Sequence, residues 1–210
     1  MTMDGIMNIQ LFIISSMIII IAPGPDFIYV TTRGISDGNK AGVISAFGIS
    51  AGLLIHTLFA AFGLSAIIQA SRTAYFIIKY LGAGYLIFIG VKAILSKSKN
   101  IEFKTDKTYK NGNIFKQGIL TNIFNPKAIV TFMAFLPQFV STTILHPITQ
   151  FTFLGLILST MAMIWFGFVG YFAGIFGAFI KRNNIIQNGI KYISGSVMIL
   201  LGLRLAINKE

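Results

Sequence analysis

The sequence contains no cysteine and only two histidines among its 210 residues. Disulfide bonds and metal sites built from thiolates are therefore excluded. His56 and His146 lie far apart in the sequence and form no local metal-binding motif. We accordingly expect neither a metal site nor a cofactor.

Charged residues are also scarce, at 11% of the chain, whereas hydrophobic residues make up 55%. This balance is far more apolar than that of a soluble domain and predicts an integral membrane protein. A formal net charge of +11 could indicate a nucleic-acid partner, but seven of the 17 Lys and Arg residues lie between Lys92 and Lys116. Basic loops at membrane ends explain this clustering more simply, so we expect no nucleic acid.

The N-terminal segment MTMDGIMNIQ lacks the positive charge with which a signal peptide begins. The apolar run after it ends in PGPD, which is not a small-residue cleavage site. We therefore expect the first apolar segment to be retained as a membrane span.

Six segments are long and apolar enough to cross a bilayer, which takes roughly 20 mostly apolar residues. We predict an all-α integral membrane protein in which residues 1–210 form a single transmembrane domain. The fifth segment is too long to cross upright at about 1.5 Å per residue, so it should tilt, protrude or break near Gly170 and Gly174. The predicted spans are Ile6–Thr32, Ala41–Gln69, Ala74–Leu95, Gln117–Phe139, Ile148–Ile180 and Ile185–Ile207.

The Lys and Arg residues outside these spans predict the orientation. Most lie in the first-to-second, third-to-fourth and fifth-to-sixth connections. The positive-inside rule places these connections, including the loop 96–113, in the cytoplasm and both termini outside. Because the loop also carries apolar residues such as Phe103, it either lies on anionic lipid headgroups or is a solvated connector.

Matches at three sequence offsets indicate that a three-helix unit is duplicated, with copies at about residues 1–95 and 114–210. A unit with an odd number of helices inverts when it is duplicated. Many secondary transporters have this arrangement, and their binding sites form near the midplane from interrupted helices. The matches pair Gly48 with Gly155, Gly63 with Gly170, Lys79-Tyr80 with Lys191-Tyr192, Gly90 with Gly202, Lys92 with Arg204, and PDFI at 25–28 with PKAI at 126–129.

The last match marks two helix starts inside membrane spans. Pro25 follows Gly24 in PGPD, and Pro126 follows Asn125 in NPKA. Proline favours the first position of a helix because the amide it lacks would have no partner there, and Asn is a good N-cap. Unpaired backbone at that depth requires surrounding protein or a wet cavity, so we expect both starts to line a cavity.

Asp26 and Lys127 carry opposite charges within apolar sequence. Inserting each charge at the centre of a membrane helix costs about 2.5–3.5 kcal/mol of free energy on insertion scales. A carboxylate in the first turn complements the helix dipole, so Asp26 has a structural explanation as well as a functional one. A cation in the first turn opposes the dipole, which favours a functional role for Lys127. Lys127 beside free helix amides would bind a carboxylate, and Asp26 would bind an ammonium group or a proton. Together they suit a zwitterion.

His56 is a third polar group deep in a predicted span. It either relays protons, because histidine titrates near neutrality, or forms a hydrogen bond that packs two helices. The glycine pairs of GISAG at 48–52 and GYFAG at 170–174 are typical of close helix contacts. We interpret them as packing residues and assign no special role to Trp165.

Four motifs make the sequence similar to the lysine exporter and homoserine-threonine exporter (LysE/RhtB) family of bacterial inner-membrane amino-acid exporters. They are APGPD at 22–26, AGLLIHTLFAAFGLSAII at 51–68, KYLGAGYLIFIGVKAI at 79–94 and NPKA at 125–128, and the resemblance covers nearly the whole chain. The resemblance implies export of amino acids or close derivatives, driven by proton motive force. It also implies a translocation pathway at Pro23, Gly24, Pro25, Asp26, Asn125, Pro126 and Lys127.

We therefore expect a secondary transporter that alternates access around Asp26 and Lys127. Because the spans hold no further buried acid, a neutral substrate such as threonine or homoserine is favoured over a basic one. The expected partners are the amino acid, protons and membrane lipids, and a homo-oligomer is left open. A channel is the alternative, since paired half-helices also build selectivity filters. An enzyme is disfavoured because the spans lack a clustered His, Asp or Ser constellation.

Overall fold

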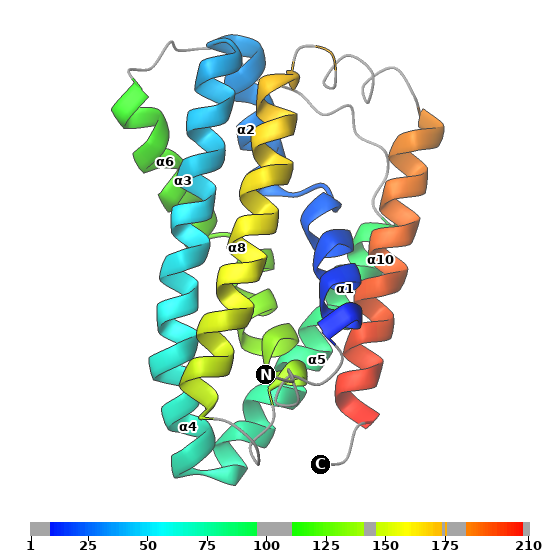
Figure 1. Cartoon of the computed structure of the whole chain (residues 1–210). Coiled ribbons are helices and arrows are strands. Elements are labelled where there is room, and N and C mark those ends of the chain that lie inside the picture. Colours follow the sequence, from blue (N-terminus) through cyan, green and yellow to red (C-terminus); the bar gives the residue numbers. More distant parts are fainter. Residues whose placement is uncertain (1–8, 96–110, 141–145, 174, 176–183, 208–210) are drawn as a thin grey trace.

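The structure is a computed structural model that describes residues 9–95, 111–140, 146–173, 175 and 184–207. Within these residues every regular element is a helix, as predicted, and the longer helices run side by side as a bundle (Figure 1). The elements are α1 (Ile9–Ile21), α2 (Pro25–Ser36), α3 (Asn39–Leu58), the π-helix η1 (Phe59–Leu64), α4 (Ser65–Ala70), α5 (Arg72–Leu95), α6 (Asn111–Ile123), α7 (Pro126–Val130), the π-helix η2 (Thr131–Phe135), the 3₁₀-helix η3 (Leu136–Phe139), α8 (Pro147–Tyr171) and α10 (Asn184–Ile207).

Three helices of the described chain are long and apolar enough to cross a membrane, namely Asn39–Ile67, Phe76–Leu95 and Pro147–Tyr171. The pairs α1 with α2 and α6 with α7 to η3 pass the same test if each bent pair counts as one span, which gives up to five. These apolar helices agree with the prediction of an integral membrane protein. The sixth predicted span falls on α10, whose described apolar stretch Gly195–Ile207 is shorter, so that span stays a prediction.

Two predicted boundaries need correction. Helix α6 already begins at Asn111, so the last residues of the predicted loop 96–113 are helical. The apolar pattern did not predict this first turn of the helix because its residues, Asn-Gly-Asn, are polar or small. Residues 96–110 of the predicted loop lie outside the described part of the chain. Helix α8 ends at Tyr171, next to the predicted break at Gly170, whereas Gly174 is not among the described residues.

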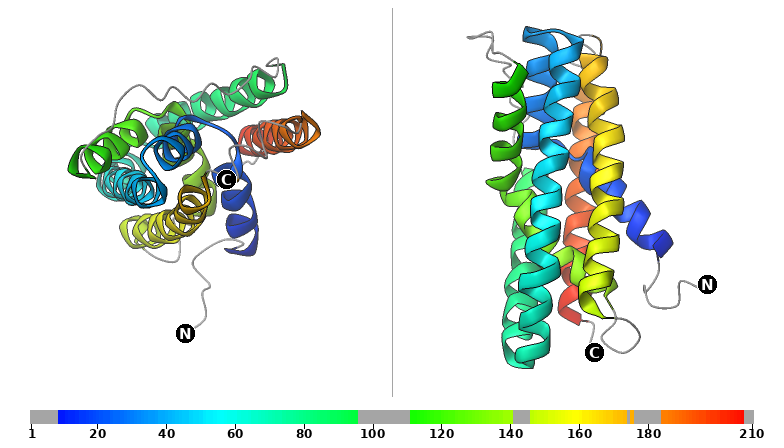
Figure 2. Two further views of the ribbon diagram at one scale, coloured as in Figure 1. Left: turned by 90° about the horizontal axis from the view of Figure 1, so that it is seen from above. Right: turned by 60° about the vertical axis from the view of Figure 1, so that its left-hand side comes forward.

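The helices predicted to be copies pack against each other, α3 along α8 and α5 along α10 (Figure 2). Glycines allow the backbones to approach closely: a Cβ atom on Gly42 would lie 2.6 Å from the carbonyl carbon of Gly170, and one on Gly202 would lie 2.8 Å from the carbonyl oxygen of Ala83. The interpretation of Gly170 as a packing residue is therefore confirmed. The duplication itself stays a prediction.

Helix α2 lies near the centre of the bundle when it is seen along the helices (Figure 2, left), and it packs on α3, α6 and α8. Half-helix α1 is tied to the other bent pair by an aromatic cluster. The ring of Phe12 lies 5.6 Å from that of Phe135 and 5.2 Å from that of Phe139, centroid to centroid. The two breaks are thus held within one core.

Candidate functional site

The first break separates α1 from α2, whose axes differ by 55°. Gly24 is the N-cap of α2 in extended conformation, and Pro25 occupies the first turn. The predicted helix start is confirmed, because proline needs no amide partner at this position. Asp26 follows in the same first turn with only 4% of its surface exposed.

The second break separates α6 from α7, with a bend of 52°. Asn125 caps α7, since its Oδ1 accepts a hydrogen bond of 2.9 Å from the backbone amide of Lys127, and Pro126 again lies in the first turn. This predicted start is confirmed as well. Three prolines lie at the two breaks, and all of them are exposed: Pro23, Pro25 and Pro126. They end or start helices there without being buried in the protein.

Asp26 is held by a residue that the sequence analysis did not single out. Its Oδ2 accepts a hydrogen bond of 3.0 Å from Nδ2 of Asn122, in the last turn of α6. Nδ2 of Asn125 is also buried and has no hydrogen-bond partner among the described residues. The second carboxyl oxygen, Oδ1, is buried and has no hydrogen-bond partner within the described chain.

Lys127 crosses to the other half-helix. Its Nζ donates hydrogen bonds to the carbonyl oxygens of Ile19 at 2.9 Å and Ala22 at 2.7 Å. These carbonyls belong to the last turn and end of α1, the negative end of that helix. The sequence analysis favoured a functional role for Lys127 because its ammonium group opposes the dipole of α7. The structure adds a structural explanation, because the same group complements the dipole of α1.

Asp26 and Lys127 are close enough to interact electrostatically. Both lie in the described part of the chain, and no direct ion pair joins them. Gly24 lies between the two helix ends, where a Cβ atom on it would be 3.5 Å from Nζ of Lys127. The fold thus brings the two predicted charges together and leaves them unpaired with each other.

His56 reaches the same place from α3. Its Nε2 lies 3.3 Å from the backbone oxygen of Asn122, and its ring stacks on that of Phe132 with centroids 5.4 Å apart. Because a carbonyl oxygen can only accept, the imidazole nitrogen donates. His56 and Asp26 each form a hydrogen bond with Asn122. His56 therefore has a packing partner, and its proton-relay role is still a prediction.

Asn122 and Gly52 are the members of the site that sequence reasoning missed or placed elsewhere. Asn122 is fully buried, and a Cβ atom on Gly52 would lie 2.8 Å from its Oδ1. Gly52 therefore does pack closely, as predicted, but on a site residue. An available signal was a second asparagine three residues before Asn125, in the last turn before the break.

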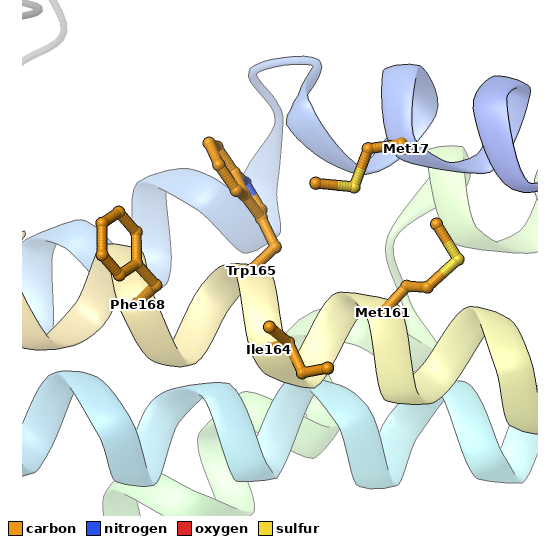
Figure 3. Close-up of a pocket in the computed structure, with 5 residues that line it drawn as sticks. All are labelled: Met17, Met161, Ile164, Trp165 and Phe168. Carbon is orange, nitrogen blue, oxygen red and sulfur yellow. The ribbon is translucent and has the colours of Figure 1, made fainter.

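An apolar pocket of about 300 Å³ lies between α1 and α8 (Figure 3). Trp165, to which the sequence analysis assigned no role, lines it together with Met17, Met161, Ile164 and Phe168. The side chains of Met17 and Trp165 approach each other across the pocket, beside the link between α1 and α2 (Figure 3). The pocket offers apolar and thioether contacts and no charged group.

The described residues contain no group of three or more His, Asp or Glu side chains that could hold a metal ion. The side chains gathered at the two breaks are one carboxylate, one ammonium group, two amides and one imidazole. Such groups can form hydrogen bonds to charged ligands.

Comparisons with known proteins agree with the resemblance seen in the motifs. The membrane protein YrhP of Bacillus subtilis is 32% identical over 93% of this chain and 96% of its own length. The leucine efflux protein of Salmonella typhimurium is 27% identical over 79% of this chain and 78% of its own length. No solved structure matches. A family model described as LysE type translocator matches residues 17–209, and the chain therefore belongs to this family, whose members are transporters and not enzymes.

Proposed function

We propose that the chain is a secondary transporter that exports neutral amino acids across the bacterial inner membrane. The observation that carries the proposal is the pair of opposite charges at the two helix breaks, the buried Asp26 and the partly buried Lys127. Oδ1 of Asp26 is buried and has no hydrogen-bond partner in the described part of the chain, so it can accept a hydrogen bond from the ammonium group of a substrate once the site opens. A carboxylate can take the third N–H of Lys127, since two are already donated to α1.

The expected substrate has no net charge. Asp26 is the acid that faces the break, and Lys127 already lies beside it, so a second positive charge on the substrate would have no partner. The leucine efflux relatives and the apolar pocket at Trp165 add leucine to the hydroxylated amino acids that the sequence favours. Leucine, threonine and homoserine are therefore the first substrates to compare.

Transport requires the helices to move, because Asp26 and Asn125 are almost fully buried. The bends of 55° and 52° are the natural hinges, and rocking of one three-helix unit against the other would expose the site to each side in turn. We propose that protons drive this motion and that His56 and Asp26 are the groups that carry them.

The orientation follows from where the basic residues lie. The end of α2, the starts of α3 and α6 and the end of α8 lie at the upper end of the bundle in Figure 1, and Arg33, Lys40 and Lys116 belong to this end. Helix α1 begins and α10 ends toward the other end. This grouping supports a cytoplasmic upper end with both termini outside.

An export assay tests the proposal. Cells that express the chain are fed a leucine- or threonine-containing dipeptide, and the amino acid released to the medium is measured over time. Expression should raise release several-fold, and Asp26→Asn should abolish the gain. The asparagine amide oxygen can still accept the hydrogen bond from Asn122, so this variant should reach the membrane in normal amount. Full release by an abundant Asp26→Asn variant contradicts the proposed site.

A further inference from the structure

Asn122 is a fully buried polar residue in the last turn of α6. A buried amide destabilises a protein unless it is hydrogen-bonded. Replacing it by an apolar residue would avoid that cost, so its contacts need an explanation beyond filling space.

Those contacts join three elements at one residue. The side-chain Nδ2 donates to Asp26 of α2 at 3.0 Å, and the backbone oxygen lies 3.3 Å from Nε2 of His56 in α3. The same oxygen accepts a hydrogen bond of 3.0 Å from the amide of Asn125, which closes the turn at the second break. A shift of α6 therefore moves the partners of Asp26 and His56 together.

The orientation of the Asn122 side chain is set by α3. A Cβ atom on Gly52 would lie 2.7 Å from the Cβ and 2.8 Å from the Oδ1 of Asn122, so only glycine lets the side chain lie this close. The carboxylate of Asp26 accepts hydrogen bonds and cannot donate, which requires the NH₂ group of Asn122 to face it. Gly52 and Asp26 thus leave one arrangement for this amide.

We propose that Asn122 is a positioning residue of the transport site, which holds Oδ2 of Asp26 so that Oδ1 stays free for the ammonium group of the substrate. This inference rests on the proposed export of amino acids. Asn122 acts through Asp26 and needs no contact with the substrate itself. Its loss should weaken substrate binding more than it slows the transport cycle.

The experiment measures counterflow of labelled leucine, or of labelled threonine if wild type exports that amino acid, in vesicles with purified protein. Asn122→Ala should raise KM about tenfold, the size expected when one hydrogen bond to a charged group is lost. A residue that only stabilised the fold would lower the maximal rate and leave KM unchanged. Asn113→Ala, at the exposed start of the same helix, should match wild type.

Gly52→Ala and Gly42→Ala form a matched pair that still decides the question if Asn122→Ala is not recovered from membranes. Both insert one methyl group between α3 and a neighbouring helix, but Gly52→Ala meets Asn122 of α6, whereas Gly42→Ala meets the backbone of α8, with the carbonyl carbon of Gly170 at 2.6 Å. Only Gly52→Ala should raise KM. Equal KM increases in both variants overturn the proposal, as does a wild-type KM in Gly52→Ala and Asn122→Ala.

These outcomes differ from a failure of the proposed function. If wild type shows no counterflow with any amino acid, export itself is wrong. If wild type is active, Asp26→Asn is inactive and Asn122→Ala keeps the wild-type KM, then only the positioning role of Asn122 is wrong.

Discussion

Nζ of Lys127 lies 2.7 Å from the carbonyl oxygen of Ala22, 105 positions earlier in the chain. With the bond to Ile19 at 2.9 Å, this contact ties the start of α7 to the end of α1. A broken helix inside a membrane leaves carbonyl groups without amide partners. The lysine supplies their donors, so one side chain serves both the proposed substrate site and the stability of the break.

Lys127→Met should therefore lower stability as well as transport. Methionine has a similar length but no donor, so the two carbonyl oxygens lose their partners at a cost of about 1–3 kcal/mol each. Lys127→Arg keeps donors and charge and should retain more of the stability. Thermal unfolding of the purified protein in detergent measures the difference. Lys116→Met, at an exposed lysine of α6, is the control, and an equal melting temperature in Lys116→Met and Lys127→Met would rule out the structural role.

Gly24 lies beside Lys127, so the size of the side chain at position 24 affects the space around the ammonium group. Its backbone is extended, with φ −170° and ψ −175°, so any residue can adopt the conformation. A Cβ atom would meet Nζ of Lys127 at 3.5 Å, which is an ordinary contact. Gly24→Ala should thus export at nearly the wild-type rate.

Gly24→Leu should lose most export, because the larger side chain displaces the ammonium group from the end of α1. Gly63→Leu is the matched control, since a Cβ atom on Gly63 has nothing within 4 Å. Export and membrane abundance are measured for all three variants. Equal export by the two leucine variants would show that the space at Gly24 is unimportant.

The breaks could be predicted from the sequence because their causes are local. Proline at the first helical position and an asparagine cap act within three residues, and both starts, at Pro25 and Pro126, lie where the motifs place them. The partners of Lys127 and of Asp26 could not be predicted, because they lie about a hundred positions away. Only packing of the two bent pairs brings them together.

The two π-helices also could not be predicted from the sequence. Phe59–Leu64 continues α3 a few residues after His56, and Thr131–Phe135 follows α7. Their residues are ordinary helix-forming or apolar types, so nothing local distinguishes them from α-helix. Both segments pack on distant helices, η1 on α8 and η2 on α5, and π-helical segments are frequent at functional sites.

The contact between α3 and α8 makes a prediction about stability alone. A Cβ atom on Gly42 would lie 2.6 Å from the carbonyl carbon of Gly170, and neither backbone can move without moving its helix. Gly42→Ala should therefore destabilise the protein by about 1–3 kcal/mol, as overpacking does. Gly84→Ala, where a Cβ atom has open space, should be neutral or slightly stabilising because alanine favours helix. Chemical unfolding in mixed micelles compares them, and equal stability would contradict the close packing.

The absence of cysteine from the chain makes the orientation directly testable, since each introduced cysteine is the only thiol. Asn39→Cys and Asn113→Cys place a thiol at exposed positions of the basic end, which is the upper end of the bundle in Figure 1. Thr73→Cys and His146→Cys place one at exposed positions of the opposite end. None of the four removes a Lys or Arg residue. A membrane-impermeant maleimide added to intact cells should label positions 73 and 146, and should label 39 and 113 only after the cells are permeabilised, because the positive-inside rule keeps the basic end in the cytoplasm. The reverse pattern would show that export, if it occurs, runs through an oppositely inserted chain, and labelling of all four in intact cells would show that these helices do not separate two compartments.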